Sequence, residues 1–182
     1  YKKIDVLINN AANDYFPKKT SNNKLKFENF LNELWDKDIA VSLKGSYLCT
    51  KVFGSYMSKF KKGSIINVSS DLGIIAPDQR IYNKSNFIKP VTYSVVKHGI
   101  IGLTKYTASY WGNKNIRCNA IAPGGIFNNQ DIKFVKELNQ LIPLGRMAKK
   151  NEYNGLILFL CSELSSYLTG SVIIADGGRS II

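Results

Sequence analysis

The sequence has 182 residues, a formal net charge of +12, and 45% hydrophobic and 21% charged residues. This length suits one domain with a buried core, and the composition is that of an ordinary globular protein. No apolar run reaches the roughly 18 residues of a membrane helix, and the first residues, interrupted by Asp5, do not form a signal peptide.

The positive charge is carried by dispersed lysines, which form only pairs such as Lys61-Lys62. A solvated lysine-rich surface therefore explains the charge better than a nucleic-acid or lipid partner does. A third interpretation is that the charge attracts an anionic cofactor or substrate. Cys49, Cys118 and Cys161 lack metal or redox spacing, so we expect small buried hydrophobes of a reduced, cytoplasmic protein and no metal site.

The first half of the chain predicts two strands with helices between them. Ile4 to Ile8 is a short apolar run typical of a buried parallel strand, and the polar residues 13–24 predict a loop. We then expect a short helix and a long helix from about Trp35 to Phe60, ended by Lys61-Lys62-Gly63 with a glycine stop. Ser64 to Val68 predicts the second strand. The expected buried face of these helices consists of Phe27, Phe30, Leu31, Leu34, Ile39, Leu43, Tyr47, Leu48, Val52 and Tyr56.

The second half continues the alternation of helices and strands. Residues 71–91 contain Pro77 and Pro90 and predict a loop. Thr92 to Trp111 predicts a helix. Its expected core positions are Val95, Val96, Ile100, Leu103, Thr104 and Thr107. The later expected elements are a strand from Asn115 to Ile121 stopped by Pro123-Gly124-Gly125, a helix from Asp131 to Leu141, a turn at Pro143 to Arg146, a helix from Lys150 to Leu160, and a strand from Ser171 to Ala175.

Strands that alternate with helices predict parallel βαβ units with right-handed crossovers, and hence an α/β fold. Ligands of such sheets bind beyond the carboxyl ends of the strands. Asn10, Ser70 and Pro123 all follow predicted strands at those ends. The pattern therefore predicts a ligand site at this edge of the sheet.

Tyr93 and Lys97 are four residues apart, which places both side chains on one face of the predicted helix. Taken alone, such a pair is more often a solvated surface pair. A free phenol has a pKa of about 10, and a nearby ammonium favours the phenolate. With a serine hydroxyl such as that of Ser70 to hold a carbonyl oxygen, the set suits proton transfer to or from a carbonyl or an alcohol.

Four stretches in chain order resemble the classical short-chain dehydrogenase/reductase family, over Asp5 to Gly178. They are Asn9-Asn10-Ala11-Ala12, Ser69-Ser70, Tyr93-Ser94-Val95-Val96-Lys97 and Pro123-Gly124-Gly125. The resemblance implies a Rossmann-like parallel sheet with helices on both faces. It also implies an NAD- or NADP-dependent oxidoreductase that interconverts a secondary alcohol and a ketone.

The resemblance assigns roles to particular positions. It implies that Ser70, Tyr93 and Lys97 are catalytic, with Ser70 rather than Ser69 as the serine, because the second serine of the pair usually matches. Ser69 is expected to bond only to nearby backbone. The implied cofactor-binding residues are Asn10, Ala11, Ala12, Tyr93, Lys97, Pro123, Gly124, Gly125 and Ile126.

The sequence departs from the family pattern at three positions. Ala12 stands in the place of a glycine, and Asn128 stands where the family often has threonine. Ser42 occupies the place of the family's fourth catalytic residue, an asparagine, so the proton relay is either kept or weakened there. His98, the single histidine, follows Lys97 and faces away from the Tyr93–Lys97 face, which favours a surface or packing role.

No Gly-x-Gly-x-x-Gly occurs in the 182 residues, and the first residue is Tyr1 rather than Met. We therefore expect residues 1–182 to be a single domain equivalent to the C-terminal part of a short-chain dehydrogenase/reductase fold. Such a chain would bind NAD or NADP weakly by itself and, with Ile4 to Ile8 at a sheet edge, tend to aggregate. The alternative is a truncated or decayed, non-catalytic member that keeps the fold and its oligomer surface. A nucleic-acid-binding module is a further alternative, supported only by the charge.

Two further expectations concern substrate and partners. Residues 77–90 mix cations with aromatic residues, which suits a sugar carrying phosphate, with Arg80 and Lys84 as its contacts. With Pro143-Leu144-Gly145-Arg146-Met147, this loop resembles a bacterial branch associated with surface-glycan and flagellin modification, which implies a sugar or nucleotide-sugar substrate. The family also implies a homo-oligomer, dimer or tetramer, with an apolar patch at Tyr47, Phe53, Tyr106 and Tyr110.

Overall fold

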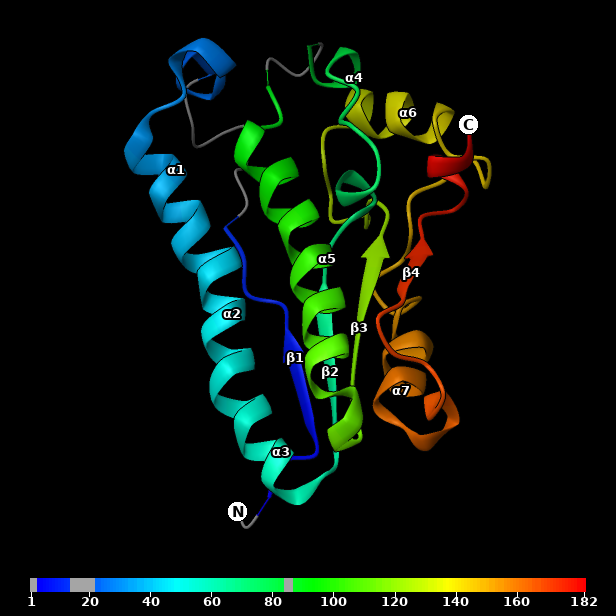
Figure 1. Ribbon diagram of the computed structural model, residues 1–182. Coiled ribbons are helices and arrows are strands. Elements are labelled where there is room, and N and C mark those ends of the chain that lie inside the picture. Colours follow the sequence, from blue (N-terminus) through cyan, green and yellow to red (C-terminus); the bar gives the residue numbers. More distant parts are fainter. Residues whose placement is uncertain (1–2, 14–21, 84–86) are drawn as a thin grey trace.

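The computed structural model describes residues 3–13, 22–83 and 87–182. Four parallel strands form one sheet in the order β1-β2-β3-β4, with helices on both of its faces (Figure 1). The strands are β1 (Val6–Asn9), β2 (Gly63–Val68), β3 (Ile116–Pro123) and β4 (Val172–Ala175). The predicted α/β fold with a Rossmann-like parallel sheet is thus confirmed, and β1 is an edge strand as expected.

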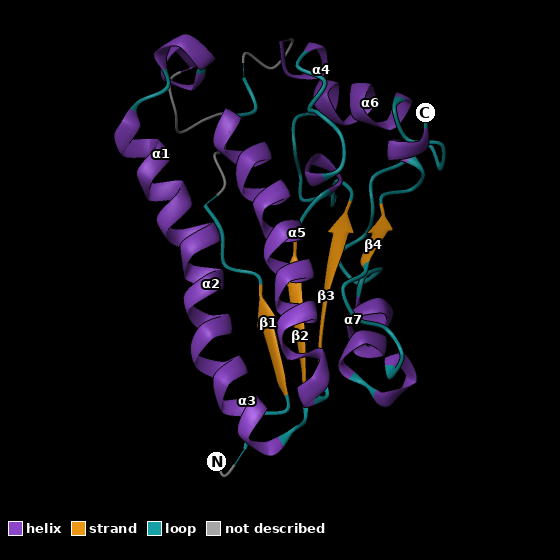
Figure 2. Cartoon of the chain, in the orientation of Figure 1, coloured by secondary structure: helices purple, strands orange, loops and turns teal. Residues whose placement is uncertain are grey.

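A nearly continuous helical rod runs along one face of the sheet (Figure 2). It consists of α1 (Asn32–Asp38), α2 (Gly45–Cys49) and α3 (Ser55–Phe60), joined by π-helical segments at Ile39–Lys44 and Thr50–Gly54. The predicted long helix is therefore present, but it begins at Asn32 and is interrupted by wider turns.

The buried stripe of this rod repeats every four residues: Asp38, Ser42, Ser46, Thr50 and Gly54 are all buried. An α-helix has 3.6 residues per turn, so a four-residue repeat would drift around its surface. Wider π turns compensate for the drift and keep the stripe directed at the sheet. The expected apolar buried face is therefore wrong in part: five of its residues are exposed, and the other five, Phe30, Leu34, Ile39, Leu43 and Tyr56, are only partly buried. The exposed apolar residues of the segment are Phe27, Leu31, Trp35, Val41, Tyr47, Leu48, Val52 and Phe60.

The rod ends differently from the prediction. Lys61 adopts a left-handed conformation, with φ of 51°, and donates its backbone N–H to the Ser58 carbonyl. Gly63 is already the first residue of β2, where an added Cβ would lie 2.5 Å from the Met57 sulfur. The glycine is thus required by close packing of strand and helix, and the lysine supplies the turn.

Helix α5 (Val91–Trp111) lies beside the rod on the same face, and α7 (Asn154–Cys161) covers the other face (Figure 1). The predicted burial of Val96, Ile100, Thr104 and Thr107 on α5 is confirmed. Val95 is 39% exposed, which corrects its expected core position; one residue from Val96, it lies about 100° around the helix. Helix α7 begins later than predicted.

A further group of short helices covers the carboxyl ends of the strands. Here α4 (Arg80–Asn83) and α6 (Ile132–Gln140) enclose an apolar cluster. Residues 71–91, predicted as loop, thus contain helical turns. The cluster comprises Leu25, Ile81, Tyr82, Phe87, Leu138, Ile142 and Met147. The 3-10 segments are Asn22–Leu25, Phe27–Asn29, Asp71–Gly73, Gly112–Lys114, Glu163–Ser165 and Arg179–Ile181.

Within the described residues, the structure contains no helix with both the length and the apolar character needed to span a membrane.

The three thiols are unpaired, but only Cys118 is fully buried; Cys161 is partly buried and Cys49 is exposed, contrary to expectation. Burial raises the pKa of the Cys118 thiol to about 12. We therefore expect iodoacetamide at pH 8 to alkylate Cys49 while the native protein protects Cys118, because the thiolate is the reactive form. Peptide mass spectrometry before and after unfolding measures this. Equal labelling of both thiols in the folded protein would contradict the structure.

Candidate active site

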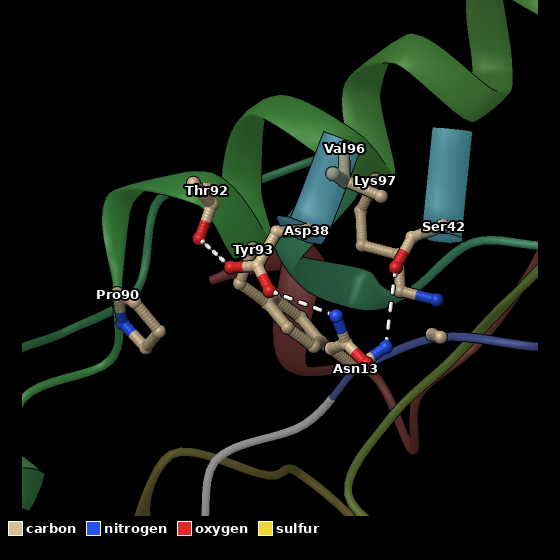
Figure 3. Close-up of a pocket in the computed structure, with 9 residues that line it drawn as sticks. Asn13, Asp38, Ser42, Pro90, Thr92, Tyr93, Val96 and Lys97 are labelled. Atoms are coloured by element: carbon tan, nitrogen blue, oxygen red, sulfur yellow. Dashed lines mark hydrogen bonds between the residues drawn. The ribbon is translucent and has the colours of Figure 1, made fainter. Parts of the chain in front are cut away.

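Tyr93 and Lys97 project from the first turns of α5 into a pocket beyond the carboxyl ends of β1 and β2 (Figure 3). The Lys97 ammonium donates to the Val68 carbonyl oxygen at 3.0 Å and lies 5.6 Å from the centre of the Tyr93 ring. Lys97 is buried and Tyr93 is half-buried. The two side chains share one helix face, as their spacing predicts. The lining residues are Ala12, Asn13, Asp38, Ser42, Pro90, Thr92, Tyr93, Val96 and Lys97.

Ser69, which follows β2, fixes α5 against the sheet. Its hydroxyl donates to the Lys97 carbonyl oxygen at 2.7 Å. The partner is backbone, but it lies 28 residues along the chain rather than nearby. Gly73 allows this approach, since an added Cβ would meet the Ser69 hydroxyl at 2.5 Å and the Lys97 carbonyl oxygen at 2.9 Å. Ser69 therefore sets where Lys97 stands.

Ser70 is buried at the start of the 3-10 turn Asp71–Gly73, which packs against α5. Its hydroxyl donates to the Asp71 carboxylate at 2.7 Å and accepts the Leu72 N–H at 3.2 Å. Ser70 is not among the residues that line the Tyr93 pocket. The structure thus places Ser70 at the end of β2, where the Lys97 ammonium also binds. The hydroxyl proton of Ser70 is directed to Asp71.

A buried carboxylate holds the turn after β1 against α5. The Asp38 side chain accepts hydrogen bonds from the Thr92 hydroxyl at 2.5 Å and from the Asn13 side-chain amide at 3.2 Å (Figure 3). Thr92 directly precedes Tyr93, so the same carboxylate positions both sides of the pocket. Sequence reasoning missed Asp38, Thr92 and Asn13, although the four-residue repeat from Asp38 to Ser46 was a signal for a buried polar stripe.

Ser42 has a defined partner in this network. Its hydroxyl accepts the backbone N–H of Asn13 at 3.2 Å, and its carbonyl oxygen accepts the Ser46 hydroxyl at 2.7 Å. The side chain therefore holds the turn that follows Ala12 at the pocket wall. This is a positioning contact, made at the place where the family pattern has asparagine.

Lys89, just before α5, is a second cation beside Tyr93, although it is not among the residues that line the pocket. Its ammonium lies 3.7 Å from the centre of the Tyr93 ring. The Gln79 side chain holds this segment, donating to the Lys89 carbonyl oxygen at 2.9 Å and accepting its N–H at 3.1 Å. Burial raises the pKa of the neighbouring Tyr82, and the charge on Lys89 partly opposes that shift.

The predicted substrate cations are placed differently. Arg80 forms a two-pronged ion pair with Asp78, with Nη2–Oδ2 at 2.7 Å, and its side chain is 87% exposed. This contact lowers the pKa of Asp78 to about 2. Lys84 lies outside the described residues. His98 is exposed, with Nδ1 2.9 Å from the Ser94 carbonyl oxygen, in keeping with its expected surface role.

The predicted cofactor segments fall into two places. Asn10, Ala11 and Ala12 are exposed after β1, and Ala12 lines the Tyr93 pocket. The Pro123–Ile126 segment begins at the last residue of β3 and contributes Gly124 and Gly125 to a separate hollow, which is also lined by α7 and by the end of β4. There the backbone of Gly124 pairs with β4 and leaves no room for a side chain: an added Cβ would lie 2.8 Å from the Asp176 Cα.

Comparison with known proteins places this arrangement among dehydrogenases and reductases. Residues 1–180 match the family model described as "Enoyl-(Acyl carrier protein) reductase". The 3-oxoacyl-[acyl-carrier-protein] reductase of Thermotoga maritima is 39% identical over 100% of this chain and 68% of its own length. An NAD-dependent glycerol dehydrogenase of Listeria innocua is 33% identical over 100% of this chain and 66% of its own.

Solved structures agree with the sequence relatives. A short chain dehydrogenase from Leptospira borgpetersenii with bound NAD⁺ superimposes with a TM-score of 0.86 at 36% identity, covering 97% of this chain and 65% of that one. A 3-oxoacyl-[acyl-carrier protein] reductase with bound NAD from Brucella melitensis gives 0.83 at 27% identity, covering 98% and 63%. The chain thus spans about two thirds of the length of the relatives it matches.

Proposed function

This chain belongs to the classical short-chain dehydrogenase/reductase family, and from that membership we propose that it acts as an NAD(P)-dependent oxidoreductase that interconverts a secondary alcohol and a ketone. The observation that carries the proposal is the pairing of Tyr93 and Lys97 at the strand ends, with the Lys97 ammonium fixed by the Val68 carbonyl. We further propose that residues 1–182 form one domain, the C-terminal part of the fold.

In the proposed reaction Tyr93 moves the proton. During oxidation the Tyr93 phenolate would accept the hydroxyl proton of the alcohol, and during reduction the Tyr93 hydroxyl would return a proton to the ketone oxygen; a bound nicotinamide would accept or supply the hydride. The Lys97 ammonium offsets the negative charge of the deprotonated phenol. Ser70 donates a hydrogen bond to the substrate oxygen, where negative charge grows during reduction.

The residues at the strand ends fit the nicotinamide–ribose part of NAD or NADP. Ala12 and Asn13 share a pocket with Tyr93 and Lys97, whose ammonium can reach ribose hydroxyls. The small side chains of Ala11 and Ala12 let backbone approach a ligand closely. We propose that Asn10, Ala11, Ala12, Pro123, Gly124, Gly125 and Ile126 hold the cofactor together with Tyr93 and Lys97. When bound, the nicotinamide supplies or accepts the hydride.

The test is an assay of the protein as encoded by its gene, following nicotinamide absorbance at 340 nm with NADH or NADPH and a panel of ketones. We expect carbonyl-dependent oxidation of one cofactor and the reverse reaction with the matching alcohols. Absence of turnover with bound cofactor would favour the alternative, a decayed member that keeps the fold and oligomer surface.

We propose that the substrate carries an anionic group, as a nucleotide-sugar does, and that Lys89 contacts it. Lys89 stands over the Tyr93 ring on a segment fixed by Gln79. We expect Lys89→Gln to raise KM for an anionic ketone about tenfold, equivalent to about 1.4 kcal/mol, with little change in kcat.

The matched control for this prediction is Arg80→Gln, because Arg80 is exposed and already paired with Asp78. KM for a neutral ketone serves as the second control. A Lys89→Gln variant that loses affinity equally for neutral and anionic ketones would remove Lys89 from substrate recognition.

We also propose a homo-oligomer, dimer or tetramer, built on the outer face of the helical rod and α5. Tyr47, Tyr106 and Tyr110 are 46%, 67% and 62% exposed there, while Phe53 is half-buried. The rod buries its small polar stripe and exposes its apolar side chains, which favours a partner surface.

Three unpaired thiols support a reducing compartment, the cytoplasm.

A further inference from the structure

The Ser70 hydroxyl is fully engaged within the protein. It has one proton to donate, and that proton is directed to Asp71 Oδ1 at 2.7 Å, while the Leu72 N–H donates to its oxygen at 3.2 Å. Ser70 is 5% exposed. For Ser70 to bind a substrate oxygen, its proton must leave the Asp71 carboxylate. Whatever controls the strength of that carboxylate as an acceptor therefore also controls Ser70.

Asp71 is itself held by a residue from the far end of the chain. Its Oδ2 accepts from Arg179 Nη1 at 2.7 Å, across 108 residues, and its Oδ1 accepts the Leu72 N–H at 2.8 Å. Asp71 and Arg179 are 3% and 5% exposed. The two charges face each other in a buried setting, where a guanidinium and a carboxylate interact far more strongly than at a surface.

The conformation of the turn before Arg179 places the Arg179 side chain against Asp71. The Asp176 carboxylate, which follows β4, accepts the Gly178 N–H at 2.9 Å and the Ser180 N–H at 2.8 Å. Gly177 and Gly178 have positive φ values of 69° and 90°, the region that favours glycine. The hydrogen bonds of Asp176 and the two left-handed glycines thus fix the conformation of the C-terminal turn. In this conformation Arg179 points inward to Asp71.

We propose that Asp71 and Arg179 are positioning residues that control the Ser70 hydroxyl, an inference that rests on the proposed function of Ser70. Asp71 holds the hydroxyl proton in the resting site. Arg179 neutralises the carboxylate, which weakens it as a competing acceptor. A substrate oxygen that gains negative charge then accepts a hydrogen bond from the Ser70 hydroxyl more readily. It is also not repelled by an unneutralised Asp71 carboxylate next to the serine.

The experiment measures kcat and KM for ketone reduction in the protein as encoded by its gene, in four variants. They are Arg179→Gln, the double variant Asp71→Asn/Arg179→Gln, Ser70→Ala, and Arg179→Gln in the Ser70→Ala background. We expect Arg179→Gln to lower kcat about tenfold, less than the roughly 10²- to 10³-fold cost of removing a hydrogen-bond donor to a reacting oxygen, with KM nearly unchanged.

The double variant separates positioning from structural support. It removes both charges and leaves two neutral amides, so we expect kcat to recover to within about threefold of the parent. In the Ser70→Ala background, Arg179→Gln should change the residual rate by less than about twofold, because coupled residues are non-additive. If Arg179→Gln fails to fold, the coupling is still tested by the double variant, by Ser70→Ala and by the conservative variant Arg179→Lys. We expect Arg179→Lys to keep kcat.

Three outcomes would overturn the inference alone, and the first two are an active parent whose kcat is unaffected by Arg179→Gln and an equal loss in the single and double variants. A loss that persists in the Ser70→Ala background would do the same, since the effect would then bypass the serine. A parent protein without turnover would instead refute the proposed function, and this inference with it.

Discussion

Tyr93→Phe is expected to lower kcat by about 10²- to 10⁴-fold, the contribution typical of a positioned acid–base group. The substitution removes only the phenolic oxygen, and the ring keeps its contacts with Lys89 and Lys97, whose ammonium groups lie 3.7 and 5.6 Å from its centre. Cofactor affinity should therefore change little. Steady-state kinetics in both directions, with calorimetric titration of NADH and NADPH, measures the two effects separately.

The matched control is Tyr106→Phe, on the same helix but 67% exposed. It should leave kcat unchanged. A Tyr93→Phe variant that keeps the parent rate, at normal cofactor affinity, would show that the proton is moved by another group and would end the proposed role of Tyr93.

Asn67→Ala is expected to reduce the free energy of unfolding by about 2–4 kcal/mol, because it creates a cavity and leaves buried polar groups without partners. Asn67 has no exposed surface. Its oxygen accepts from the Asn9 amide at 2.8 Å, and its amide donates to the Thr104 hydroxyl at 2.9 Å. The Asn9 amide also donates to the Thr50 hydroxyl at 2.9 Å. Asn67 and Asn9 together thus join β1, β2, the rod and α5 below the site.

Urea unfolding of the protein followed by far-ultraviolet circular dichroism measures this loss. Asn113→Ala, at an exposed asparagine of the 3-10 turn after α5, is the matched control and should shift the midpoint little. An Asn67→Ala variant as stable as this control would mean that the buried polar network contributes nothing net to the fold.

The local pattern of the sequence was sufficient for the four strands, for the main helices and for the edge of the sheet that carries the candidate site, but not for the helical turns within residues 71–91. Apolar runs of strand length alternating with helical periodicity allow few arrangements other than a parallel sheet with helices on both faces. Parallel strands in turn bring their carboxyl ends together. The four-residue spacing of Tyr93 and Lys97 placed both on one face of α5 for the same local reason.

Sequence periodicity failed on the helical rod, and the reason is physical. Apolar side chains predict burial only when the apolar face meets the chain's own core. Here the stripe at Asp38, Ser42, Ser46, Thr50 and Gly54 is buried instead, because small and hydrogen-bonded side chains let the rod approach the sheet and α5 closely. No single-sequence rule shows which of two faces will pack inward.

The contacts that position the candidate site were decided by tertiary structure alone. Asp38 meets Thr92 across 54 residues, Lys89 lies over Tyr93 on a segment that Gln79 holds, and Asp71 meets Arg179 across 108 residues. Charged and polar residues of these types are common on surfaces, and apart from the four-residue repeat that begins at Asp38, nothing in their sequence surroundings marks them as buried. Their roles arise because the parallel sheet brings the segments after β1, β2 and β4 to one edge, where buried polar groups must pair with one another.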